Sequence, residues 1–201
     1  MKYEAILFDF DGVLADTEPL HYASWAEILR GEGILLDWET YRRRCIGMHD
    51  RQMVEFFCSL RTPPLSVAEL WKRYEAKRSL FLKLALNSPP VPPETAELVK
   101  DLRKYKMAVV TSSDLAEVEP VLESAGLRQY FQLLVCGAEV VRPKPDPEPY
   151  LLARNALGVQ WALAVEDSEA GVASARAAGL VVIRVRHPAE TARRVRGALT
   201  R

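Results

Sequence analysis

The chain has 201 residues, of which 49% are hydrophobic and 27% are charged, a composition that suits a globular protein with one core or a core plus a small insertion. Lys plus Arg and Asp plus Glu both number 27, which argues against nucleic acid or an anionic membrane as a partner. The three cysteines form no CxxC pair, which argues against structural zinc and a disulfide framework. With no secretory signal and no apolar stretch of about 20 residues, we expect a cytoplasmic protein, and we expect a monomer.

The apolar segments of the chain are short and alternate with helical patterns. Residues 4–10 predict a first buried strand. Strands that alternate with helices are typical of an α/β fold with a parallel, Rossmann-like sheet. Four more strands are predicted at 107–111, 133–136, 162–165 and 181–185, with helices near 94–105, 114–125, 146–157 and 168–178.

The segment from about residue 18 to 86 shows helical periodicity and no convincing strand. It ends at the Pro-rich stretch 87–93, which cannot continue a helix. We interpret it as a helical insertion after the first strand, with hinges near 14–18 and 86–92. The expected organisation is therefore a catalytic core formed by residues 1–15 and 89–201, with a helical cap formed by residues 16–88.

Polar residues follow three of the predicted strands. The first strand ends in Asp9 and Asp11, the second in the run that begins at Thr111, and the fourth in Glu166 and Asp167. In open parallel α/β sheets, ligands bind beyond the carboxyl ends of the strands. We therefore expect these side chains to line one crevice.

The carboxylates predict a metal site. Asp9 and Asp11 are two positions apart on extended chain and point the same way. Together with Glu166 and Asp167 they would gather negative charges that repel one another unless a cation intervenes. Oxygen ligands without His or Cys favour Mg²⁺, which also accepts phosphate in its coordination shell. For one Asp-x-Asp pair we would favour ordinary surface acids, but the placement of acidic residues at the ends of two strands reverses that preference.

Three further residues suit a phosphoryl group. Thr111 and Ser112 could hold phosphate through a hydroxyl and the following backbone N–H groups, and Lys144 would supply a point charge. Each is a weak signal alone, because Ser and Thr clusters usually cap helices.

At this point the sequence resembles a known family. Asp9-Phe-Asp-Gly-Val-Leu-Ala-Asp-Thr-Glu-Pro resembles the first motif of the haloacid dehalogenase superfamily of phosphatases and mutases. Thr111 matches the second motif, Lys144 the third, and Glu166-Asp167-Ser-Glu-Ala-Gly the fourth. The motifs occur in the family's order and span essentially the whole chain. The sequence is most similar to the β-phosphoglucomutase-like and phosphoglycolate phosphatase-like subgroup, which carries a helical cap after the first strand.

The resemblance implies a role for each matched residue. Asp9 would be the nucleophile that forms a phospho-aspartate, and Asp11 the general acid and base. Mg²⁺ would be held by the Asp9 side chain, the Asp11 carbonyl oxygen and Asp167, with help from Glu166. Thr111, Ser112 and Lys144 would bind the phosphoryl group of a small phosphorylated metabolite.

The resemblance says less about the cap. His21 and Trp25 match positions near the substrate entrance, although packing of the first cap helix explains them equally well. The loop 47–52 faces the catalytic crevice in relatives. Asp50 stands where β-phosphoglucomutase has an arginine that grips the distal phosphate of its substrate, and Arg51 is one place away. A phosphatase is therefore the first interpretation and a β-phosphoglucomutase-like sugar phosphomutase the alternative.

Other readings fit less well. A dehalogenase proper would not need Asp11 or a full metal site. A phosphonate hydrolase would need a Schiff-base lysine, and no cap lysine lies in a recognisable motif. A phospho-receiver domain carries its phosphorylated Asp on a mid-chain strand and lacks a helical insertion, and a non-catalytic binding domain would lack Asp9, Asp11 or Asp167.

Overall fold

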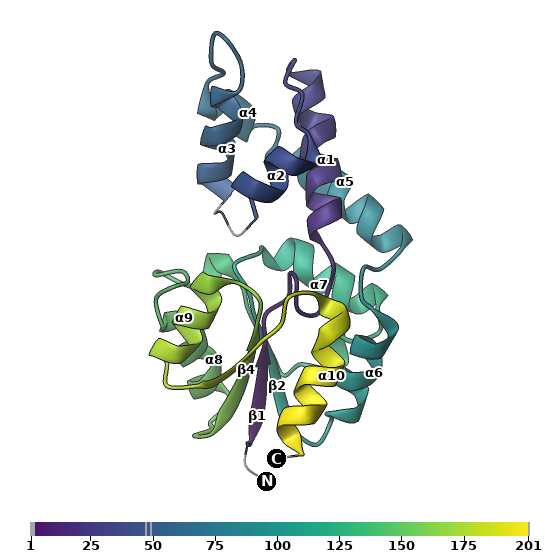
Figure 1. The fold of residues 1–201 in the computed structure, drawn as a ribbon, viewed down its shortest axis with the longest axis vertical. Coiled ribbons are helices and arrows are strands. Elements are labelled where there is room, and N and C mark those ends of the chain that lie inside the picture. The colour runs from purple at the N-terminus through teal and green to yellow at the C-terminus, as the bar shows by residue number, and fades with distance from the viewer. Residues whose placement is uncertain (1–2, 47, 49, 201) are drawn as a thin grey trace. The chain divides into compact units, whose positions relative to one another are not determined.

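The computed structural model describes residues 3–46, 48 and 50–200. The chain forms two compact units. The first, called here the sheet unit, consists of Met1–Thr17 and Pro89–Arg201. The second, called here the helical unit, is Glu18–Ser88. Figure 1 shows that the first contains the strands and that helices make up the second.

The sheet unit is built on five parallel strands in the order β3-β2-β1-β4-β5. The strand from the N-terminal end of the chain therefore lies at the centre, where both faces are covered, which explains why β1 is apolar at every position. The predicted strands and the Rossmann-like α/β class are confirmed. The strands are β1 (Ala5–Phe8), β2 (Lys106–Val110), β3 (Leu133–Val135), β4 (Ala162–Glu166) and β5 (Val181–Arg184).

Helices cover both faces of this sheet (Figure 1). Helices α8 and α9 lie on one face, and α6 and α10 pack together on the other. Helix α10 was not among the predicted helices, because its buried residues include no Leu, Ile, Met or aromatic side chain. They are Pro188, Thr191, Ala192 and Val195. The helices are α6 (Pro93–Asp101), α7 (Leu115–Ser124), α8 (Glu148–Ala156), α9 (Glu169–Ala177) and α10 (Pro188–Leu199), with 3₁₀ turns η1 (Arg128–Tyr130) and η2 (Gly137–Glu139).

The helical unit has a core of its own. Trp25, Leu29, Tyr41 and Phe57 are among its buried members, each at most 1% exposed. Within the described part of the chain, no helix is long and apolar enough to cross a bilayer, and α1 and α5 have only 14 residues each. The helices of this unit are α1 (Glu18–Gly31), α2 (Trp38–Arg44), α3 (Asp50–Ser59), α4 (Val67–Trp71) and α5 (Tyr74–Asn87).

The chain passes from one unit to the other at two adjacent points. The Asp16 N–H donates to the Pro90 carbonyl at 2.7 Å, so the outgoing and returning segments are tied together. The Thr17 hydroxyl is fully buried and donates to the Asp11 carboxylate. These two contacts hold residues 16 and 17 in the sheet unit, so the division falls two residues later than the expected cap boundary.

The buried thiol of Cys136 is expected to make the folded protein less stable at alkaline pH. Burial raises the pKa of Cys136 to about 12, well above the value of about 8.5 for an exposed thiol. Between about pH 9 and 11, the unfolded chain would lose the Cys136 proton and the folded chain would keep it. The contribution of this thiol to stability therefore falls by about 1.4 kcal/mol for each unit that the pH rises.

The Cys136→Ala variant is expected to lose less stability than the wild type over this range. The free energy of unfolding, measured by urea denaturation at a series of pH values, should fall less steeply in the variant by about 1.4 kcal/mol per pH unit. Parallel pH profiles for the two proteins would contradict the prediction.

Candidate active site

Two carboxylates lie side by side where the central strands end. Strands β1 and β4 pair in register with Phe8 opposite Val165, so Asp9 and Glu166 follow at the same level of the sheet. Asp9 is 7% exposed and Glu166 is fully buried. Oxygens of Asp9, Glu166 and Asp167 all lie within 4.8 Å of one another. Three of the four carboxylates expected to gather, all but that of Asp11, therefore meet at the carboxyl edge of the sheet.

Lys144 points into this cluster from the loop before α8. Its Nζ donates to the Glu166 Oε1 at 2.6 Å and to the Val110 carbonyl at 2.8 Å, and lies 3.2 Å from Asp9 Oδ1. Burial alone would lower the pKa of Lys144, but the Asp9 and Glu166 carboxylates outweigh it and hold the pKa above its ordinary value. The amine is therefore a fixed positive charge beside the Asp9 carboxylate.

The positive charge of Lys144 does not by itself neutralise the negative charge of the acidic cluster. Burial, reinforced by the neighbouring Glu166, raises the pKa of Asp9 well above its usual range. An additional positive charge is needed to keep Asp9 fully ionised. The clustered donors are carboxylate oxygens with no His or Cys among them, a set that fits Mg²⁺.

Two glycines let the backbone approach these carboxylates. A Cβ on Gly12, whose φ is +70°, would lie 2.3 Å from Asp167 Oδ2. A Cβ on Gly171, in the first turn of α9, would lie 2.0 Å from the Glu166 carboxylate. Any side chain at either position would displace a carboxylate of the cluster.

The carboxylate of Asp11 is not part of this acidic group and instead contacts hydroxyl groups. Its Oδ1 accepts from Thr17, and its Oδ2 accepts from Ser113 Oγ at 2.5 Å and from Thr111 Oγ1 at 3.4 Å. These hydroxyl groups orient the Asp11 carboxylate. Sequence reasoning missed Thr17 and Ser113 as partners of Asp11, and the N-cap of α7 is Asp114. Thr111 stands 3% exposed among these groups, and Ser112 is exposed just beyond it.

A further residue that sequence reasoning missed is Tyr150, on the first turn of α8. The fully buried phenol donates to Glu166 Oε1 at 2.7 Å. Burial, together with the charge of Glu166, raises the pKa of Tyr150 well above its ordinary value, so the phenol stays protonated and remains a donor. The only signal in the sequence was a tyrosine six positions after Lys144, which has no meaning without the packing of α8.

Two of the remaining sequence-predicted candidates, His21 and Trp25, lie on α1 in the helical unit. His21 stacks on Phe81, with ring centroids 4.3 Å apart, and its Nδ1 lies 2.9 Å from Lys77 Nζ. Trp25 is 1% exposed and packs against Phe57, the position that the core-packing alternative expects.

The loop expected to face the substrate is described only in part. Gly47 and His49 lie outside the described residues. The Asp50 carboxylate accepts from the Tyr74 hydroxyl at 2.5 Å. Arg51 is largely exposed and lies 3.9 Å from Glu55 on the same helix. The acid at position 50 is thus engaged within its own unit.

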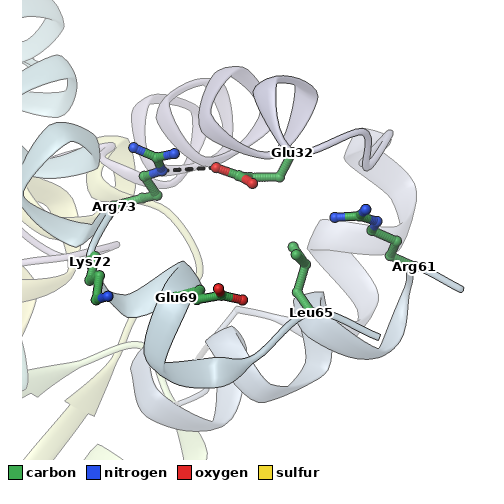
Figure 2. A pocket seen from close by; sticks show the side chains of 6 residues that line it. All are labelled: Glu32, Arg61, Leu65, Glu69, Lys72 and Arg73. Atoms are coloured by element: carbon green, nitrogen blue, oxygen red, sulfur yellow. Dashed lines mark hydrogen bonds and ion pairs between the residues drawn. The ribbon is translucent and has the colours of Figure 1, made fainter. Parts of the chain in front are cut away.

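The helical unit also contains an open hollow of about 440 Å³. Figure 2 shows its lining side chains and the ion pair between Arg73 and Glu32, whose charged atoms are 2.8 Å apart. None of the sequence-predicted site residues lines it. The lining residues are Glu32, Arg61, Leu65, Glu69, Lys72 and Arg73.

Comparisons with known proteins give a consistent result. The model of the haloacid dehalogenase-like hydrolase family matches residues 3–179. A phosphorylated carbohydrates phosphatase of Thermotoga maritima is 34% identical over 88% of this chain and 82% of its own. The fructose-1-phosphate phosphatase YqaB of Escherichia coli is 33% identical over 92% of this chain and 97% of its own. The structure is also similar to the crystal structure of CbbY from Rhodobacter sphaeroides in complex with phosphate, with a TM-score of 0.76. The sequence identity is 30%, and the match covers 91% of this chain and 87% of that chain.

Proposed function

The chain belongs to the haloacid dehalogenase-like hydrolases, and from this premise we propose that it is a Mg²⁺-dependent phosphatase of a small phosphorylated carbohydrate. The observation that carries the proposal is the convergence of Asp9, Lys144 and the Glu166–Asp167 pair at one edge of the sheet. The relatives named as phosphatases of phosphorylated carbohydrates support the choice of substrate class.

In the first step, a carboxylate oxygen of Asp9 attacks the phosphorus atom of the substrate. The bond from phosphorus to the ester oxygen breaks, and Asp11 gives its proton to that oxygen as the alcohol leaves. Lys144 stabilises charge on the phosphoryl oxygens from its position 3.2 Å from Asp9. The products are the alcohol and a phospho-aspartate at Asp9.

In the second step, water attacks the phosphorus atom of the phospho-aspartate. Asp11 is now the base and takes a proton from this water, and the bond between Asp9 and phosphorus breaks. Inorganic phosphate leaves, and both aspartates return to their starting protonation states. Thr17 and Ser113 hold the Asp11 side chain near the site between these two transfers.

The residues that would hold Mg²⁺ are Asp9 and Asp167 through their carboxylates and Asp11 through its carbonyl oxygen, with Glu166 beside them. When bound, the ion neutralises the clustered charge and polarises the phosphoryl group. The fit rests on the all-oxygen donor set and on the uncompensated charge at Asp9.

Adding Mg²⁺ is expected to stabilise the folded protein. An ion that binds only the folded state contributes about 2.7 kcal/mol at 100 times its dissociation constant, which differential scanning fluorimetry would record as a higher melting temperature. The Asp167→Asn variant should lose most of this shift. The Asp101→Asn variant, which changes an acid paired with Arg196 on the surface, should keep it. An equal shift in both variants would contradict the assignment of the metal site.

The helical unit is proposed to act as a cap that closes over the crevice and selects the substrate. Hydrolysis is favoured over transfer to a second sugar hydroxyl because an acid, Asp50, occupies the position of the distal-phosphate arginine. The Asp50 carboxylate accepts a hydrogen bond from the Tyr74 hydroxyl. It offers no positive charge that could bind a second phosphate group.

The proposed function is tested by following phosphate release. Release from p-nitrophenyl phosphate and from a panel of sugar phosphates should require Mg²⁺ and stop in EDTA. An incubation with β-glucose 1-phosphate, Mg²⁺ and a trace of glucose 1,6-bisphosphate separates the two chemistries. Free phosphate should appear faster than glucose 6-phosphate, and the reverse order would establish the mutase instead.

A further inference from the structure

We propose that Tyr150 is a positioning residue that holds Glu166, and through it Lys144, in the geometry that binds the phosphoryl group. The proposal rests on the function proposed above. Tyr150 lies outside the four matched motifs and does not contact the Asp9 carboxylate directly. Its hydroxyl instead donates a hydrogen bond to Glu166 Oε1, the same oxygen that accepts a hydrogen bond from the Lys144 amine.

The contacts of the amine divide into two kinds. Two are short hydrogen bonds to groups other than Asp9, at 2.6 Å to Glu166 Oε1 and 2.8 Å to the Val110 carbonyl oxygen. The third, at 3.2 Å to Asp9, lies where a phosphoryl oxygen would arrive. The first two contacts fix the amine, and the third can be exchanged for substrate. Glu166 is therefore one of the two anchors that aim Lys144.

Glu166 needs an anchor of its own, because its side chain must keep one orientation. Its other oxygen, Oε2, accepts only longer bonds, at 3.2 Å from the Asp167 N–H and 3.4 Å from Ser168 Oγ. Apart from the lysine itself, the phenol at 2.7 Å is the shortest donor to this carboxylate. Removing it would leave Oε1 with Lys144 alone, and the two side chains could then move as a pair.

Tyr150 is itself held rigidly. The ring is fully buried in the core that α8 forms with the sheet, and Lys144 Nζ lies 5.4 Å from the ring centroid. Because α8 fixes the phenol, the phenol holds the Glu166 carboxylate in place, and the carboxylate in turn holds the Lys144 amine. Groups that orient ligands and catalytic residues in this way are commonly worth about 10- to 100-fold in affinity or activity.

The test compares two variants that each remove one buried hydrogen bond from the sheet unit. Tyr150→Phe keeps the ring and removes only the hydroxyl. Thr95→Val removes the bond from Thr95 Oγ1 to the Pro188 carbonyl, 2.9 Å long, between α6 and α10. Thermal denaturation of both variants measures how much each loses in stability.

Two readouts then distinguish positioning from simple destabilisation. The first is the affinity for inorganic phosphate in the presence of Mg²⁺, measured by calorimetry, which should be about 10- to 100-fold weaker in Tyr150→Phe and unchanged in Thr95→Val. The second is the rate at which acetic anhydride acetylates Lys144, measured by peptide mass spectrometry against exposed lysines. This amine, 5% exposed, should react faster in Tyr150→Phe and at the wild-type rate in Thr95→Val.

Wild-type values of either readout in Tyr150→Phe, or equal changes in both variants, would overturn the proposal and leave Tyr150 as a packing residue. The acetylation experiment needs no turnover. If the wild-type protein released no phosphate from any phosphomonoester, the proposed function would fail, and the Lys144 acetylation rates would still decide whether Tyr150 holds the amine.

Discussion

The Asp9→Asn variant is expected to show no Mg²⁺-dependent phosphate release and no phosphoenzyme. The amide has nearly the shape of the carboxylate but is not a nucleophile toward phosphorus. Rapid quenching with a ³²P-labelled sugar phosphate should label the wild-type protein and leave the variant unlabelled. Turnover in the variant above a trace would rule out the covalent route through Asp9.

Loss of folding can be separated from loss of chemistry in this variant. Burial raises the pKa of Asp9, so its ionised form is unfavourable in the folded protein without metal. A neutral amide should therefore not lower the melting temperature measured in EDTA. Asp101→Asn provides a matched control, because this surface acid lies outside the proposed site, and it should retain wild-type activity.

The Asp11→Asn variant is expected to lose about 10²- to 10⁴-fold in kcat, the usual contribution of a positioned acid and base. The structure places this carboxylate among the hydroxyls of Thr17 and Ser113 and not among the clustered metal donors. The variant should therefore bind Mg²⁺ nearly as well as the wild type in a calorimetric titration. An unchanged rate, or a loss confined to metal affinity, would show that the role is misassigned.

The choice of leaving group sharpens this second prediction. p-Nitrophenolate departs without a proton, so Asp11→Asn should still form the phosphoenzyme from p-nitrophenyl phosphate. Its hydrolysis would remain slow, because the base that activates water is missing. A burst of p-nitrophenol followed by slow turnover is the expected result for the variant. A sugar phosphate, whose alkoxide needs the proton, should give no burst.

The sequence alone predicted the parallel sheet, because each strand is a short apolar run that is recognisable locally. It also predicted which residues gather at the site, since parallel strands bring their carboxyl ends to one edge. Asp9, Glu166 and Lys144 could be proposed together for this reason, although they come from three separate segments. The family resemblance then supplied expected roles that strand positions alone do not specify.

Tertiary structure decided which atoms meet. Asp11 and Ser113 are 102 positions apart, and Tyr150 and Glu166 are 16 apart, so neither bond has a local pattern that could reveal it. Trp25 was ambiguous for the same reason, because an aromatic residue on a helix can face a core or a substrate. Periodicity indicates that a side chain will be buried, but only the packing of helices and strands within each unit determines which partner it meets there.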